Sequence, residues 1–203
     1  FIFISTIAVN GRQPRGVAFT ADDVAAPQAP HAQSKYEAEV GLEKIAAQTG
    51  LEVVIIRPPL VYGPRVSGNF RLLVRALSRG IPLPLGAVTH NRRSLVALDN
   101  LVDLIHVCLT HPAAKNQKFL VCDGQDLSTT DLLRRMAQAM GRPARLWPLP
   151  PRLLQWGARL LGKGDAAQQL LGSLQVDSRK TQDILGWKPC ITVEEGLRRA
   201  VKQ

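Results

Sequence analysis

The sequence is poor in cysteine, in acidic residues relative to basic ones, and in long apolar runs. Three cysteines form no C-x-x-C pair, and their odd number argues against a disulfide framework or a zinc site. We therefore expect free thiols and no metal site. No apolar run reaches the roughly 20 residues that a membrane helix needs, and residues 1–5 lack the charged segment of a signal peptide. These absences predict a globular, cytoplasmic protein without a membrane span.

The charge is strongly basic, with 26 Lys and Arg residues against 16 Asp and Glu residues. Such an excess is typical of proteins that bind nucleic acids, because clustered cations release counterions from phosphates. Here the cations are dispersed over predicted helix surfaces and loops, and the 5% of aromatic residues do not interleave with them. We expect no nucleic-acid partner, and a modest attraction for phosphate-bearing substrates.

Two apolar runs flank a predicted helix in the first part of the chain. Residues 1–5 and 51–57 (LEVVIIR) are typical of buried parallel strands. Between them, Pro30 favours a helix start and Gly50 a helix end, with an inward stripe predicted at Ala38, Leu42, Ile45 and Ala46. A strand, a crossover helix and a strand predict the right-handed parallel unit of a doubly wound sheet.

The later residues predict further helices and a ligand-binding loop. The Pro- and Gly-rich residues 58–68 follow the second strand, at the sheet end where open α/β proteins bind ligands. Helices are expected over about 69–80 and 99–110 and after Ser128 or Thr129, with a strand at 118–122. Residues 148–164 are apolar and basic enough for an interfacial membrane helix, but their shortness and Gly157 favour a helix packed on a small lobe.

His31 and Lys35 lie four residues apart in the predicted helix, which places an acid/base group and an ammonium on one helix face. Together with four other segments, this region resembles the extended short-chain dehydrogenase/reductases, specifically the nucleotide-sugar epimerase/dehydratase family. The segments are FIFISTIAVNG from Phe1, PHAQSKYEAE from Pro30, IRPPLVYGP from Ile56, NRRSLVALD from Asn91 and LGWKP from Leu185. The sequences of these segments are most similar to those of bacterial members that act on UDP-linked N-acetylhexosamines in O-antigen and capsule synthesis.

The resemblance implies an α/β fold: the C-terminal part of a Rossmann-type doubly wound parallel sheet plus a smaller α+β substrate-binding lobe. Residues 1–60 would be the remainder of the dinucleotide-binding domain and 61–203 mainly the substrate-binding lobe, with about 94–110 returning to the first domain. It also implies NAD or NADP as cofactor, a UDP-sugar substrate and a homodimer of the full-length protein. The family's G-x-x-G-x-x-G turn is not in this sequence. We therefore expect an N-terminally truncated chain that alone binds NAD(P) poorly and is inactive.

In the family, a Ser or Thr, a Tyr and a Lys surround C4 of the sugar. Thr6 matches the first position and Lys35 the last, but His31 stands where the Tyr is expected. Tyr36 is no substitute, because five residues correspond to a rotation of about 140° around the helix. Three interpretations stay open: lost or reduced activity, a working His31, or an error in the sequence.

The resemblance implies further binding residues. Pro58 and Pro59 would line the nicotinamide pocket, and Asn69 and Phe70 would contact the nucleotide or the sugar. Arg92 would clamp the substrate diphosphate, a task suited to a bidentate guanidinium.

The implied reaction is hydride transfer at sugar C4 by an epimerase or a 4-ketoreductase. A dehydratase is disfavoured, because Ile7 and Ala8 stand where that chemistry usually has an acidic pair. The alternatives are a sugar-nucleotide-binding protein without turnover and a dimerisation homologue of the same fold.

Overall fold

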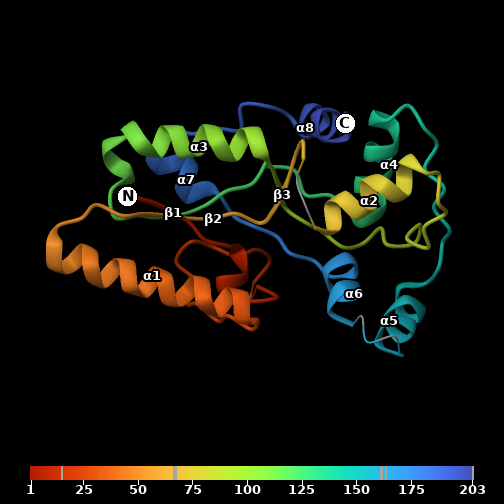
Figure 1. Cartoon of the computed structure of the whole chain (residues 1–203), viewed down its shortest axis with the longest axis horizontal. Coiled ribbons are helices and arrows are strands. Elements are labelled where there is room, and N and C mark those ends of the chain that lie inside the picture. Colours follow the sequence, from red (N-terminus) through yellow and green to blue (C-terminus); the bar gives the residue numbers. More distant parts are fainter. Residues whose placement is uncertain (15, 66–67, 161, 163, 203) are drawn as a thin grey trace. The chain divides into compact units, whose positions relative to one another are not determined.

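The computed structural model describes residues 1–14, 16–65, 68–160, 162 and 164–202 (Figure 1). These residues form two compact units, each described here by itself. Unit 1 comprises Phe1–Val61, Ser94–Gln125 and Leu174–Thr192, and unit 2 comprises Tyr62–Arg93, Asp126–Ser173 and Val193–Gln203. Within the described ranges, no helix is both long and apolar enough to cross a bilayer.

Unit 1 is built on a three-stranded parallel sheet in the order β1-β2-β5. Its strands are β1 (Ile2–Ile4), β2 (Val54–Arg57) and β5 (Lys118–Leu120). Phe3 pairs with Ile55, and Ile55 with Lys118. Helix α1 (Pro30–Thr49) lies on one side of the strands, and α3 (Leu98–Thr110) and α7 (Arg179–Leu185) lie on the other (Figure 1). This arrangement confirms the predicted α/β class with a parallel sheet.

Apart from Arg57 and Lys118 at their ends, the strands are apolar because both faces of the sheet are covered. Phe119 and Val121 pack into one apolar cluster with residues of α3 and α7. Leu120 and Cys122, which alternate with them, pack into a second cluster around Phe19. A continuous apolar run is therefore what a strand in this position requires.

The ends of α1 agree with the sequence signals, but its buried face does not. Pro30 occupies the first turn, and Gly50 ends the helix with a φ of 74°, a left-handed conformation that glycine adopts without strain. Ile45, predicted to face inward, is 47% exposed, whereas Ala32 and Glu39 are completely buried. The predicted stripe was wrong at Ile45, and it missed Glu39, whose burial is possible because Arg57 on β2 pairs with it.

Short elements complete unit 1. The turns η1 (Ile7–Val9) and η2 (Pro112–Ala114) are 3-10 helices. Strand β3 (Leu60–Tyr62), whose last residue belongs to unit 2, pairs with β4 (Leu95–Ala97) in a second sheet.

Unit 2 is mainly helical. Its helices are α2 (Asn69–Ser78), α4 (Thr129–Ala139), α5 (Pro151–Leu160), α6 (Gly164–Leu171) and α8 (Val193–Val201). Ser128 caps α4 by accepting a hydrogen bond of 3.0 Å from the Asp131 backbone N–H, as one of the two predicted caps. Helix α4 packs against α2 and α8, and α5 packs against α6.

Candidate active site

Lys35 projects from α1 to the carboxyl end of β1. Its Nζ donates a hydrogen bond of 2.9 Å to the Ile4 carbonyl and lies 4.7 Å from the centre of the Phe3 ring. The cation is therefore fixed by a carbonyl dipole and by an aromatic face. Because an ammonium has three N–H donors, this arrangement leaves donors for a ligand.

Thr6 lies two residues beyond the carbonyl that holds Lys35. Its hydroxyl caps η1 by accepting a 3.3 Å hydrogen bond from the Ala8 N–H, which leaves the hydroxyl proton for another acceptor. The Ile7 N–H donates to the Pro58 carbonyl at 2.9 Å, so the chain segments that follow β1 and β2 are joined. Pro58 and the adjacent Pro59 are buried. The structure thus brings four predicted residues to the carboxyl ends of adjacent parallel strands, where this class of sheet binds ligands.

His31 is the second residue of α1 and is exposed. It lies one turn before Lys35 on the same helix, as the spacing predicts. The imidazole is therefore accessible to a substrate from the solvent side of the first helical turn.

A buried ionic network behind these residues was missed by the sequence analysis. The Arg57 guanidinium donates from Nε to Glu39 at 3.0 Å, from a second nitrogen to the other Glu39 oxygen at 2.5 Å, and from the third to Asn10 Oδ1 at 2.9 Å. Asn10 in turn donates to the Thr20 carbonyl at 2.9 Å. The network ties β2 to α1 and to the segment after η1, and so supports the elements that carry Thr6 and Lys35. An arginine at the end of the apolar run VVIIR was the available signal.

The remaining predicted residues belong to unit 2. Phe70 is buried, with its ring centre 5.7 Å from that of Tyr62, so it packs inside that unit. Arg92 is exposed, and one guanidinium nitrogen lies 3.5 Å from the carbonyls of Thr89 and Asn91. Asn69 begins α2, and its side chain lies outside the described part of the structure. Their proposed contacts with substrate stay predictions.

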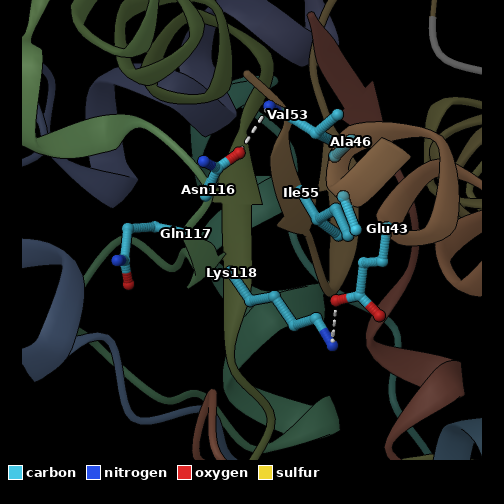
Figure 2. A pocket seen from close by; sticks show the side chains of 8 residues that line it. Glu43, Ala46, Val53, Ile55, Asn116, Gln117 and Lys118 are labelled. Atoms are coloured by element: carbon cyan, nitrogen blue, oxygen red, sulfur yellow. Dashed lines mark hydrogen bonds and ion pairs between the residues drawn. The ribbon is translucent and has the colours of Figure 1, made fainter. Parts of the chain in front are cut away.

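A pocket of about 260 Å³ opens elsewhere in unit 1 (Figure 2). Its lining comes from the C-terminal half of α1, from β2 and from the start of β5: Glu43, Ala46, Ala47, Val53, Ile55, Asn116, Gln117 and Lys118. Two of the lining residues, Lys118 and Glu43, form an ion pair of 2.7 Å, and Asn116 accepts a hydrogen bond from the Val53 N–H. None of the predicted site residues lines this pocket, so it does not enter the proposed chemistry.

The residues present fit part of a dinucleotide site. An ammonium, a hydroxyl and two buried prolines at adjacent strand ends suit the ribose and nicotinamide end of such a cofactor. The glycine-rich turn that holds a pyrophosphate is not in the sequence, so these residues would hold one end of the group.

Comparison with curated proteins finds relatives along the whole chain. The UDP-glucose 4-epimerase of Vibrio cholerae is 47% identical over 203 residues, which cover 100% of this chain and 62% of that protein. The N-acetyl-alpha-D-glucosaminyl-diphospho-ditrans,octacis-undecaprenol 4-epimerase of Escherichia coli O157:H7 is 26% identical over 99% of this chain and 64% of its own length. The chain therefore spans less than two thirds of either relative.

Solved structures and a family profile agree with these relatives. The UDP-glucose 4-epimerase of Thermus thermophilus in complex with NAD matches with a TM-score of 0.73 and 25% identity, over 98% of this chain and 62% of its own. The profile of the NAD dependent epimerase/dehydratase family matches residues 1–122, which hold β1, α1 and β2 and the predicted residues on them. The chain belongs to the NAD dependent epimerase/dehydratase family.

Proposed function

We propose that this chain carries the sugar-facing residues of an NAD(P)-dependent nucleotide-sugar 4-epimerase or 4-ketoreductase. The observation that carries the proposal is the Lys35 ammonium on the Ile4 carbonyl, at the strand end that leads to Thr6. Unit 1 would hold the dinucleotide and unit 2 most of the sugar nucleotide, with Asn69, Phe70 and Arg92 on the substrate side.

In this proposal the three residues have separate roles. The Thr6 hydroxyl donates a hydrogen bond to the oxygen on sugar C4, and the His31 imidazole moves the proton of that oxygen. Lys35 holds the ribose hydroxyls of the cofactor with the N–H groups not used by Ile4. The cofactor, when bound, supplies hydride chemistry at C4.

The exchange of Tyr for His changes what Lys35 has to do. A phenol has an unperturbed pKa near ~10 and needs a neighbouring cation to titrate at neutral pH, whereas an imidazole titrates near ~6.5 unaided. Lys35 would therefore serve chiefly as a binding residue.

The substrate proposed is a UDP-linked N-acetylhexosamine. Support comes from two relatives: one is named for UDP-glucose, and the other for an N-acetylglucosaminyl group on a diphosphate. The shared chemistry is a hexose joined to a diphosphate, to which an exposed Arg92 side chain is suited.

A second candidate is a sugar-nucleotide-binding or dimerisation homologue of the same fold without turnover. The exposed His31 at the position of the expected Tyr favours it. An imidazole is shorter than a phenol, and a proton-transfer group must come within hydrogen-bond reach of its target.

Turnover by the full-length protein separates the two candidates. With NAD and either UDP-glucose or UDP-N-acetylglucosamine, we expect formation of the C4 epimer and a loss of about 10²- to 10⁴-fold in kcat for His31→Ala. His106→Ala, at an exposed position of α3, is the matched control and should leave kcat unchanged. An inactive parent that gains turnover with His31→Tyr would instead favour the non-catalytic homologue.

A further inference from the structure

Helix α5 presents large apolar side chains to solvent. Leu153, Trp156 and Leu160 are 54%, 66% and 68% exposed. Their spacing of three and four residues places them within about 60° of one another around the helix. Single exposed apolar residues are ordinary on protein surfaces, but a continuous stripe of this size marks a surface that binds something.

The opposite side of α5 already has a partner. Leu154, Gln155 and Ala158 are half-buried, and the helix packs against α6 within unit 2. One face of α5 therefore packs within unit 2, and the exposed stripe lies on the opposite face.

The loop before α5 extends the same character. Trp147 is 67% exposed, although its backbone is fixed: its N–H donates to the Leu83 carbonyl at 2.9 Å, and its carbonyl accepts from the Gly86 N–H at 2.8 Å. The backbone of Trp147 is thus fixed by hydrogen bonds while its large aromatic side chain is exposed to solvent.

The charge on this helix has one sign. Helix α5 carries Arg152 and Arg159 and no Asp or Glu. Arg152 and Arg159, both exposed, are seven residues apart and so lie on one side of the helix, next to Trp156. The exposed face of α5 therefore combines a tryptophan and two leucines with a flanking row of arginines.

We propose that this face of α5 binds the surface of an anionic phospholipid membrane. Tryptophan is favoured at the boundary between headgroups and acyl chains, and arginine can bury its stem while its guanidinium contacts lipid phosphates. A helix of ten residues is about 15 Å long, half of what a span needs, so it lies in the plane of the interface.

Charge argues against a second copy of the chain as the occupant. A two-fold contact between identical faces would bring Arg152 and Arg159 against the same residues of the other copy, with no acidic residue on α5 to pair with them. An anionic lipid surface complements both parts of the face.

Co-sedimentation with vesicles tests the proposal. We expect binding to vesicles of equal parts phosphatidylglycerol and phosphatidylcholine, weak binding to pure phosphatidylcholine, and loss of binding at high salt. Tryptophan emission should shift to shorter wavelength on binding through Trp147 and Trp156. Trp187, which is buried and donates to Asp103 at 2.8 Å, should contribute no shift.

Two matched pairs of variants locate the contact. Leu160→Glu should lower the partition coefficient about tenfold or more, whereas Leu109→Glu on α3, where the leucine is also 68% exposed, should leave it unchanged. Arg152→Gln with Arg159→Gln should remove the preference for anionic vesicles. Lys44→Gln with Lys188→Gln, an equal loss of charge at exposed positions of unit 1, should not.

Three results would overturn the proposal. The first is no sedimentation with anionic vesicles, and the second is an equal loss of binding in Leu109→Glu and Leu160→Glu. The third is a dimer in analytical ultracentrifugation without lipid that Leu160→Glu dissociates, which would assign the face to a second copy.

Discussion

Units 1 and 2 each join distant segments through a buried polar cluster, but they use different chemistry. In unit 1 the cluster is ionic: Arg57 on β2 pairs with Glu39 on α1 and with Asn10. In unit 2 it is neutral: the Asn91 amide donates to the Thr129 hydroxyl at 2.9 Å and to the Leu170 carbonyl at 3.2 Å, and Asn91 Oδ1 accepts from the Thr129 N–H. Both clusters hydrogen-bond segments that are far apart in the sequence.

The different chemistry of the two clusters predicts how substitutions change the stability of each unit. Removing one partner of a buried ion pair leaves an uncompensated charge in a low-dielectric interior, which is far more costly than losing a neutral amide. We therefore expect unit 1 to be sensitive to single substitutions at its cluster but tolerant of replacing both partners together. Unit 2 should lose stability in smaller steps.

Arg57→Leu should have the largest effect. It leaves the Glu39 carboxylate, which is 0% exposed, without its cationic partner, so we expect the free energy of unfolding to fall by about 3–5 kcal/mol. Urea unfolding monitored by circular dichroism measures the loss. The double variant Glu39→Leu with Arg57→Leu should recover much of it, and a double variant as unstable as the single one would contradict the ionic explanation.

Asn91→Ala should have an intermediate effect. It removes the amide that bridges Thr129 and the end of α6, and the cost expected is about 1–3 kcal/mol in the same urea experiment. Gln138→Ala, at an exposed position of α4, is the control and should change stability little. A loss equal to that of Arg57→Leu would remove the distinction between the two clusters.

Thiol reactivity then tests whether the two units unfold together. All three cysteines lie in unit 1, so alkylation of the buried ones reports the opening of that unit. Burial penalises the thiolate and raises the pKa of Cys108 to about 11, so at pH 8 about a thousandth of this thiol is ionised while it stays buried. Cys190 is exposed and should react first.

We expect iodoacetamide followed by mass spectrometry to label Cys190 quickly and Cys108 slowly, because the buried thiol reacts only after unit 1 opens. If the units are cooperative, Asn91→Ala in unit 2 should speed labelling of Cys108 in unit 1. An unchanged rate would mean that unit 1 opens independently, which sharpens the contrast between the units.

The sequence predicted those parts of the fold that depend on local signals. Pro30 and Gly50 mark the ends of α1, and the β-branched run before Arg57 indicates a strand covered on both faces. The pairing of Arg57 with Glu39 was not predictable in the same way, because the two residues are 18 apart and meet through the packing of α1 on the sheet. Burial of Glu39 was missed for the same reason: an inward-facing glutamate is unexpected until its partner is known.

The candidate site shows the same division. The spacing of His31 and Lys35 could be read from the predicted helix, whereas Thr6 was identified only through the resemblance to the family. The contact of Lys35 with the Ile4 carbonyl and with the Phe3 ring depends on how α1 lies along β1, which the sequence does not state.

Exposed ion pairs should give the smallest effects, and they test whether burial is the reason for the contrast. Lys118 pairs with Glu43 at 2.7 Å in unit 1, and Arg134 lies 3.9 Å from Asp131 in unit 2, with all four side chains at least one third exposed. Water and salt screen such pairs, so Lys118→Gln and Arg134→Gln should each cost about 0–1 kcal/mol, less at high salt. If Lys118→Gln cost as much as Arg57→Leu, charge alone would explain the sensitivity of unit 1. If Lys118→Gln and Arg134→Gln instead cause equal, small losses of stability, desolvation of the Arg57–Glu39 pair remains as the cause of the sensitivity of unit 1.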